Sequence, residues 1–130
     1  MSTPKMDGAQ ALIKTLADLG IEYVFGYSGG AAIPIFDALQ TVKTDMKFIL
    51  VRHEQGAVHM ADGYARATGK PAVVLVTSGP GAGNTVTGLM TAQMDSVPMI
   101  VLCGQQVTWM LGKDAFQEAD IFNIAAPVVK

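Results

Sequence analysis

Residues 72–84 read Ala-Val-Val-Leu-Val-Thr-Ser-Gly-Pro-Gly-Ala-Gly-Asn. The first six residues form an apolar run that is rich in β-branched side chains and does not alternate with polar ones, which is typical of a strand covered on both faces. Glycines and a proline follow directly and indicate a tight turn. This stretch therefore predicts a buried strand of a parallel sheet, with a glycine-rich turn at its carboxyl end.

Similar apolar runs recur at regular intervals along the chain. The other three are 23–25, 48–51 and 99–103. Segments of helical periodicity lie before and between the runs. We expect four helices: one capped by Asp7 and ended by Gly20, one from about residue 31, one over 54–68 and one over 81–94. This alternation predicts an α/β fold, an open parallel sheet with helices on both faces and right-handed crossovers.

The composition excludes several classes of protein. Of the 130 residues, 50% are hydrophobic and 15% are charged, so the chain has enough apolar surface to fold. A net charge of −2 leaves no electrostatic footprint for a nucleic acid. The longest dense apolar run, 97–103, is far shorter than the roughly 20 residues of a membrane-spanning helix, and the first residues contain no apolar signal core. We therefore expect one cytoplasmic domain without nucleic-acid or membrane partners.

Two features of the composition concern the surface and the compartment. The mean hydropathy of +0.34 is high for a monomer and predicts that apolar surface faces another subunit or domain. The single cysteine, Cys103, cannot form an internal disulfide, which fits a reducing compartment. It ends an apolar run, so we interpret it as a buried small side chain.

The unusual residues of the chain all follow predicted strands. Open parallel sheets bind ligands beyond the carboxyl ends of their strands. Glycine-rich turns follow the first and third strands, at 26–30 and 77–83, and a charged group, Arg52-His53-Glu54, follows the second. Because these ends meet at one edge of the sheet, we expect a functional site there. The 78–84 turn resembles a phosphate-binding turn at a helix N-terminus but lacks the dinucleotide and Walker patterns, so a structural turn and a ligand-contacting turn both remain open.

The first glycine-rich turn admits two interpretations. Residues 26–30, Gly-Tyr-Ser-Gly-Gly, match the nucleophile elbow of serine hydrolases, with Ser28 as the nucleophile. Such an enzyme needs an acid and then a histidine, which Asp37 or Asp45 followed by His53 or His59 would supply in the right order. The other interpretation is a glycine-rich turn that permits close backbone approach.

Glu54 is the most informative acidic residue. It opens a largely apolar helix, where a carboxylate is stabilised by the helix dipole. It is equally suited to be a buried acid for proton transfer. His53-Glu54 does not begin a zinc motif because residue 57 is Ala, and no carboxylate cluster has metal-ligand spacing. We interpret His59 as a packed helix residue and expect no metal site in this chain.

Six blocks of residues resemble a known family. They read Gly-Tyr-Ser-Gly-Gly-Ala (26–31), Arg-His-Glu-Gln-Gly-Ala (52–57), Asp-Gly-Tyr-Ala-Arg-Ala-Thr-Gly (62–69), Thr-Ser-Gly-Pro-Gly-Ala (77–82), Asp-Ser-Val-Pro (95–98) and Asp-Ala-Phe-Gln-Glu-Ala-Asp (114–120). Together they resemble the N-terminal pyrimidine-binding domain of the acetolactate synthase (acetohydroxyacid synthase) catalytic subunit. The second and fourth blocks are shared by thiamine-diphosphate enzymes in general, whereas the last is more specific to acetolactate synthases.

The resemblance implies a fold and an activity. Residues 1–130 would form a single pyrimidine-binding domain of the thiamine-diphosphate fold, as a fragment or split piece of a larger enzyme. That enzyme would decarboxylate pyruvate and join the remaining fragment to a second 2-keto acid in branched-chain amino-acid biosynthesis. The isolated chain would then be inactive in carboligation. A non-catalytic oligomerisation module of the same fold is the alternative, and a small hydrolase using Ser28 is a more remote one.

The resemblance also assigns residues to the site. Glu54 would hydrogen-bond N1′ of the aminopyrimidine of the cofactor and promote loss of its C2 proton. Gly30 and Ala31 would lie near the reacting centre. Pro80 and Asn84 would line the aminopyrimidine pocket. The last pair, Phe116 and Gln117, would approach the substrate from the side of the neighbouring subunit, with Gln117 and Glu54 as the catalytic residues.

The cofactors and partners follow from the same resemblance. Thiamine diphosphate would bind here through its pyrimidine end, whereas Mg²⁺ and FAD would bind on domains that this chain does not contain. The chain would associate with itself and with a diphosphate-binding domain in cis or in trans, and a regulatory subunit is compatible with this arrangement. A bacterial cytoplasmic origin is expected, and an organellar origin stays open.

Several residues depart from the usual pattern of the family. Ser28 stands where Pro is usual, and the hydrolase match depends on that replacement. After Gly104-Gln105 the family commonly reads Val-Pro-Thr, whereas residues 106–108 read Gln-Val-Thr. Gly83 and Lys113 each stand where Thr is usual. These departures leave Glu54 and Gln117 in place and bear on substrate preference.

Overall fold

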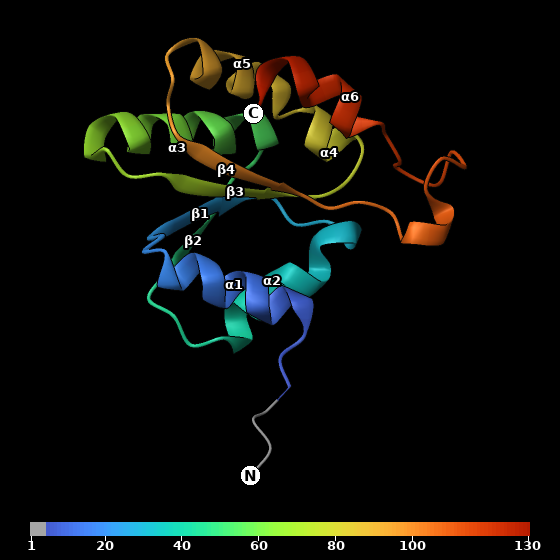
Figure 1. Ribbon diagram of the computed structural model, residues 1–130, viewed down its shortest axis with the longest axis horizontal. Helices are drawn as coiled ribbons and strands as arrows, with labels where there is room; N and C mark the ends of the chain where they lie inside the picture. Colours follow the sequence, from blue (N-terminus) through green and yellow to red (C-terminus); the bar gives the residue numbers. More distant parts are fainter. Residues whose placement is uncertain (1–4) are drawn as a thin grey trace.

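A computed structural model describes residues 5–130 of the chain. Four strands form one parallel sheet in the order β2-β1-β3-β4 (Figure 1). They are β1 (Tyr23–Gly26), β2 (Lys47–Leu50), β3 (Ala72–Val76) and β4 (Met99–Cys103). The four apolar runs are thus confirmed as strands, and the open parallel α/β fold is confirmed with them.

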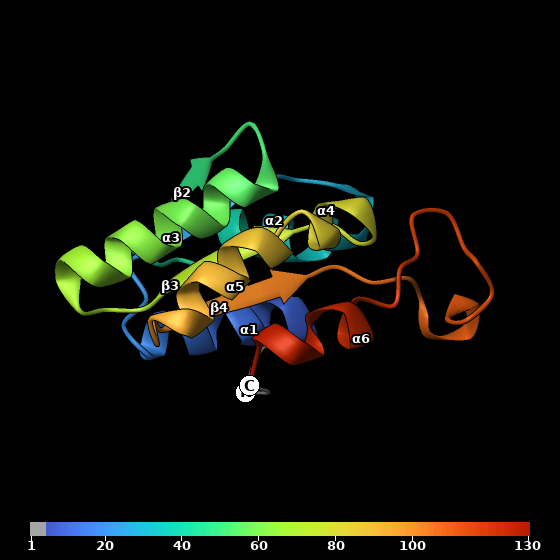
Figure 2. The same ribbon diagram turned by 90° about the horizontal axis from the view of Figure 1, so that it is seen from above.

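Helices cover both faces of the sheet. The helices α1 (Gly8–Asp18) and α2 (Ile33–Thr41) lie on one face, and α3 (Glu54–Thr68) and α5 (Val86–Met94) lie on the other (Figure 1). Figure 2 views the sheet from the side of α3 and α5. The predicted cap of α1 is present, since Gln10 donates its backbone N–H to Asp7 Oδ1 at 2.8 Å and Asp7 donates its own to Gln10 Oε1 at 3.2 Å.

The core lies in two layers because successive strand residues point to opposite faces. Within β3, Val73 and Leu75 pack toward α1 and α2, whereas Val74 and Val76 pack toward α3. Every residue of β3 is fully buried. This strand therefore matches the prediction of a strand covered on both faces.

The prediction of full burial is wrong for the two edge strands. All four residues of β2 are exposed, and those of β4 are half-buried. Each of these strands has only one hydrogen-bonded neighbour in the sheet. An apolar run thus identified each strand correctly but did not distinguish a central strand from an edge strand. Cys103, at the end of β4, is accordingly half-buried rather than fully buried, and this burial raises the pKa of its thiol to about 11.

The helix α3 has both of its predicted ends. It begins at Glu54 and is terminated by Gly69, whose φ of 71° is the left-handed conformation that glycine adopts most readily. Within the helix, Arg66 donates Nε to the buried Asp62 at 2.8 Å. Arg66 also donates Nη2 to Asp95 at 2.6 Å, at the end of α5. This network joins the two helices of that face.

The predicted helix over 81–94 is two helices. The short α4 (Pro80–Gly83) ends at Asn84, and α5 begins at Val86. Between them, the Thr85 hydroxyl donates to the Ala82 carbonyl at 2.6 Å, so a side chain satisfies a carbonyl at the break. The break frees Asn84 from a continuous helix and leaves its side chain directed toward α3.

The segment after β4 first extends beyond the carboxyl edge of the sheet and then returns, so that α6 lies on the same side of the sheet as α4 and α5 (Figures 1 and 2). It contains two short 3₁₀ turns, η2 (Thr108–Met110) and η3 (Ala126–Val128), and the helix α6 (Ile121–Ala125). The chain turns around Gly112, whose φ is 75°. Large apolar side chains are exposed here, among them Trp109 and Phe122, which agrees with the predicted apolar surface. None of the helices within residues 5–130 has the length and apolar character needed to cross a membrane.

Candidate active site

The carboxyl ends of all four strands meet at one edge of the sheet, as predicted. The chain passes from β1 to β2 on one side and then crosses back to β3 on the other, so the strand order reverses between β1 and β3. In open α/β sheets such a reversal leaves a crevice between the connections that follow the two strands. Here those connections are the two glycine-rich turns.

Glu54 lies at the centre of this edge. It is the first residue of α3 and only 9% exposed, so it is both the helix-start charge and the buried acid that the sequence suggested. Asn84 donates Nδ2 to Glu54 Oε2 at 2.9 Å. Among residues 5–130, Glu54 takes part in none of the ion pairs. The second carboxylate oxygen, Oε1, has no hydrogen-bond donor within the same residues and is available to a ligand.

A glycine brings the second turn close to Glu54. A Cβ atom on Gly81 would lie 2.7 Å from Thr77 Cγ2 and 3.2 Å from Glu54 Oε1. The Thr77 side chain therefore lies beside the Glu54 carboxylate, against a position where a larger residue would not fit. The first turn meets the same side chain, since a Cβ on Gly29 would lie 2.5 Å from Thr77 Cβ.

Two hydroxyl groups at this edge have no hydrogen-bond partner in the described part of the chain, residues 5–130. Thr77 Oγ1 and Ser78 Oγ are both buried and form no hydrogen bond within residues 5–130. Buried polar groups are nearly always paired, so each unpaired one calls for an explanation such as a bound molecule. The sequence motif included both residues but did not single them out; only their burial without a hydrogen-bond partner does so.

Some predicted site residues are hydrogen-bonded to one another, and others lie at the same edge of the sheet. Glu54 and Asn84 are hydrogen-bonded. Pro80 is the first residue of α4, the short helix that Asn84 follows. Gly30 begins η1 (Gly30–Ala32), the short turn after β1. Ala31 packs against the end of β4, since a Cβ on Gly104 would lie 2.8 Å from the Ala31 carbonyl carbon. These residues thus occupy the same edge from three connections.

The remaining predicted pair lies on the segment after β4. Phe116 is 82% exposed, and Gln117 is exposed beside it. The Gln117 backbone crosses the second glycine-rich turn so closely that a Cβ on Gly79 would lie 2.1 Å from the Gln117 carbonyl oxygen. Gly79 has φ 53° and ψ −117°, a conformation that favours glycine. This contact places the backbone of Gln117 against the glycine-rich turn that leads to Asn84.

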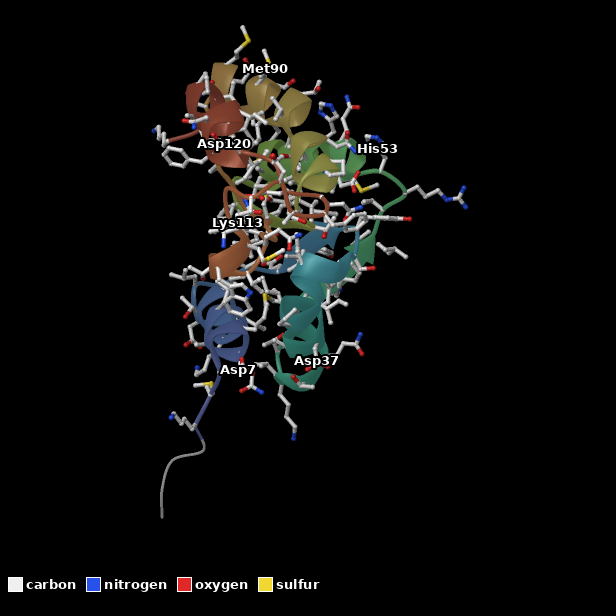
Figure 3. The ribbon with its side chains drawn as sticks, turned by 90° about the vertical axis from the view of Figure 1, so that its right-hand side faces the viewer. Asp7, Asp37, His53, Met90, Lys113 and Asp120 are labelled. Carbon is white, nitrogen blue, oxygen red and sulfur yellow. The ribbon has the colours of Figure 1, made fainter. Side chains whose placement is uncertain are left out.

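The serine-hydrolase interpretation finds no support in this geometry. Within residues 5–130 no hydrogen bond joins Ser28 to His53, and His53 Nδ1 instead accepts the backbone N–H of Gln55 at 3.2 Å. Asp37 and His53 lie on opposite sides of the sheet in the view of its carboxyl edge (Figure 3). His59 is exposed on α3, so its interpretation as a packed residue is wrong. The other interpretation, a close-packing turn, agrees with the contact between Gly29 and Thr77.

No three His, Cys, Asp or Glu side chains within residues 5–130 come together in a group that could hold a metal ion. The buried polar groups of the edge, a carboxylate, an amide and two hydroxyls, are instead suited to hydrogen-bond an organic molecule with ring nitrogens.

Comparison with known proteins identifies the family. Residues 6–124 match the model of the thiamine pyrophosphate enzyme, N-terminal TPP binding domain. The chain is 57% identical over 126 residues to the acetolactate synthase large subunit of Haemophilus influenzae, covering 97% of this chain and 22% of that protein. It is 58% identical to the acetolactate synthase isozyme 3 large subunit of Escherichia coli over 96% of this chain and 22% of that protein.

A eukaryotic relative is similar to the same degree. The mitochondrial acetolactate synthase catalytic subunit of Aspergillus candidus is 60% identical over 111 residues, which cover 85% of this chain and 16% of that protein. The chain thus spans about a fifth of the length of the relatives it matches. Both the matched model and the parallel fold agree with the resemblance, and the chain belongs to the family of N-terminal TPP-binding domains of thiamine pyrophosphate enzymes.

Proposed function

We propose that residues 1–130 form a single domain of an acetolactate synthase, which binds the pyrimidine end of thiamine diphosphate. The enzyme would decarboxylate pyruvate and join the product to a second 2-keto acid, a step of branched-chain amino-acid biosynthesis. The observation that carries the proposal is the buried Glu54 at the start of α3, hydrogen-bonded by Asn84 at the switch point of the sheet. The names of the relatives support the reaction class.

The residues of the edge fit an aminopyrimidine. Glu54 Oε1 faces Gly81 and offers an acceptor to a protonated ring nitrogen, while Asn84 fixes the other oxygen. The unpaired Thr77 hydroxyl lies at the same edge, close to Gly29, and can donate or accept a further hydrogen bond. When bound, thiamine diphosphate supplies the electron sink for decarboxylation. The part of Glu54 is to hold a proton at the ring nitrogen and to fix the orientation of the ring.

The other assigned residues surround Glu54 and Asn84 and contribute to binding of the cofactor and the substrate. Pro80 and Asn84 line the pyrimidine side, whereas Gly30 and Ala31 bring the backbone of the first turn to the reacting centre. Phe116 and Gln117 meet the 2-keto acid. Gln117 supplies an amide that can hydrogen-bond a carboxylate or keto oxygen, and the exposed phenyl ring of Phe116 supplies an apolar contact.

Further partners complete the proposed enzyme. Mg²⁺ and FAD bind outside residues 1–130, and a diphosphate-binding domain meets this edge in cis or in trans. The exposed apolar residues support self-association. A regulatory subunit and a bacterial cytoplasmic location are part of the same proposal, although relatives carry both bacterial and mitochondrial names.

The test is the exchange of the C2 proton of bound thiamine diphosphate for deuterium in the active enzyme. Glu54→Gln replaces the ionisable carboxyl with an amide of the same size that cannot transfer a proton, and it should slow this exchange by about 10²-fold or more. Glu22→Gln is the matched control, because Glu22 is exposed and pairs with Lys70 away from the site. The 130-residue chain alone should form no acetolactate from pyruvate with cofactor and Mg²⁺.

Exchange at the wild-type rate in Glu54→Gln would contradict the proposal and favour the oligomerisation module. Acetolactate formation by the isolated chain would contradict the claim that the chain supplies only part of the site.

A further inference from the structure

Residues 112–118, here called the Phe116 loop, are organised around one carboxylate. Glu118 Oε1 accepts the backbone N–H of Gly112 at 2.5 Å, and Oε2 accepts that of Ala115 at 2.9 Å. These two bonds close the loop on itself, with both carboxylate oxygens engaged. Charge-assisted hydrogen bonds of this kind are roughly twice as strong as those between neutral groups.

A second side chain ties the Phe116 loop to the sheet. Gln106, three residues after the end of β4, donates Nε2 to the Phe116 carbonyl at 2.6 Å. The residue before it has a similar but weaker contact, since Gln105 donates Nε2 to the Ala119 carbonyl at 3.3 Å. A valine at position 106 would have no side-chain donor for this bond, so the tether depends on the glutamine amide.

The backbone of the Phe116 loop needs such support. Gln117 and Asp114 have φ angles of 57° and 52°, in the left-handed region that side-chain-bearing residues adopt rarely. Strained residues of this kind persist where the surrounding structure fixes them, and they cluster at functional sites. Three contacts fix Gln117: the Gln106 bond to the preceding carbonyl, the Glu118 carboxylate after it, and the close contact of its own carbonyl with Gly79.

The contacts hold the loop through its backbone and do not use the side chains of Phe116 and Gln117. Phe116 is 82% exposed, so its ring is not used to anchor the loop. The side chains that are free to meet a ligand are therefore carried on a backbone that is fixed to the turn beside Glu54. A pocket with fixed walls discriminates between ligands that differ by one methylene group, and a pocket with a mobile wall does so less.

We propose that Gln106 and Glu118 are positioning residues that determine the choice of the second 2-keto acid, by fixing the Phe116 loop against Gly79. This inference rests on the proposed function. The substrate class is a pair of 2-keto acids that differ by one methylene group, such as pyruvate and 2-ketobutyrate, and the two residues act on them only through Phe116 and Gln117.

The first test uses the 130-residue chain without cofactor. Lys113 belongs to the Phe116 loop and its side chain is exposed. The rate of tryptic cleavage after Lys113, measured by mass spectrometry, therefore reports the opening of the loop. Gln106→Val and Glu118→Gln should each raise this rate about tenfold, while cleavage after Lys43, in the connection before β2, stays unchanged. Gln106→Glu keeps the size but loses the donor and should behave like Gln106→Val. Gln40→Val, on an exposed face of α2, is the matched control and should leave both rates unchanged.

The second test uses the active enzyme and two competing acceptors, pyruvate and 2-ketobutyrate. In Gln106→Val the ratio of their kcat/KM values should move toward one by about three- to tenfold. C2-proton exchange of the cofactor, which depends on Glu54, should stay at the wild-type rate. A structural defect of the domain would slow C2-proton exchange as well as change the acceptor ratio. A changed ratio with an unchanged exchange rate therefore identifies a positioning effect.

Two results would overturn the inference. Unchanged cleavage after Lys113 in Gln106→Val and Glu118→Gln would show that these residues do not hold the loop. An opened loop with an unchanged acceptor ratio would show that the loop does not select the substrate. Failure of the proposed function is separate, because it would be seen in Glu54→Gln and not in the cleavage assay.

Discussion

The two halves of the candidate site are built in different ways. The half around Glu54, Thr77 and Ser78 lies at the end of the fully buried strand β3 and is itself buried. The Phe116 loop lies in a stretch, residues 105–130, in which no residue is fully buried. Burial and packing therefore fix the first half, and a few hydrogen bonds from side chains to the backbone fix the second.

This difference separates stability from specificity. A change in the buried core beneath Glu54 disturbs the packing that stabilises the whole domain. A change in the Phe116 loop alters a local opening equilibrium and leaves the core intact.

The largest expected effect is on the free energy of unfolding, from a substitution in the buried strand β3. Leu75→Ala in β3 removes a fully buried side chain from the layer under α1 and α2, and we expect it to lower the free energy of unfolding by about 2–5 kcal/mol. Urea denaturation followed by circular dichroism measures this change. Phe116→Ala is the contrasting variant and should change the same quantity by less than about 0.5 kcal/mol. Equal losses in the two variants would contradict the separation.

An intermediate effect is expected where the two halves touch. Gly79→Ala places a Cβ 2.1 Å from the Gln117 carbonyl oxygen in a backbone conformation that favours glycine. We expect a loss of about 1–3 kcal/mol in the free energy of unfolding, together with faster tryptic cleavage after Lys113. Gly83→Ala, in the same turn but with open space around it, should be neutral or slightly stabilising. A Gly79→Ala variant as stable as wild type would show that the loop is not docked on this turn.

The smallest effect is confined to the Phe116 loop and depends on pH. The backbone N–H groups of Gly112 and Ala115 hold the pKa of the Glu118 carboxyl below its ordinary value of 4.5. Because these donors favour the ionised form, loop stabilisation is complete above pH 4.5 and is lost as the pH falls through the lowered pKa. The other charged side chains of the loop are those of Lys113 and Asp114.

The measurement is the pH dependence of the Gly112 and Ala115 amide signals in ¹H–¹⁵N NMR spectra. Both should shift together, with a midpoint below pH 4.5. In Glu118→Gln this common titration should vanish, while amide signals of β3 stay unchanged over the same range. A midpoint above 4.5 would contradict the hydrogen bonds of Glu118 to the loop backbone.

The sequence predicted much of the half around Glu54. Hydrophobic runs located all four strands, Gly69 marked the end of α3, and the position of Glu54 after a strand and before a helix placed it at the carboxyl edge of the sheet. Each of these inferences depends on residues that are close in sequence. The exposure of β2 was missed because its apolar residues do not reveal that a strand has only one neighbour.

The other half was predicted less well. Phe116 and Gln117 were assigned by resemblance, but nothing in the pattern indicated that Gln106 holds one carbonyl and Glu118 two amides of the same loop. The departure from valine at position 106 was the available signal. Its meaning became clear only with the distance to the Phe116 carbonyl, because a glutamine on the surface usually binds only water.

Residue patterns alone were enough to predict the parallel α/β fold, the helix caps and the edge at which the candidate site lies, because strand and helix periodicity and capping are local properties. Tertiary structure alone decided that Asn84 would reach Glu54, thirty residues earlier in the chain, and that the Gln117 carbonyl would rest on Gly79. Such contacts depend on the order of strands in the sheet and on where a helix breaks. Both are settled by packing between elements that are distant in sequence, where local propensity carries no information.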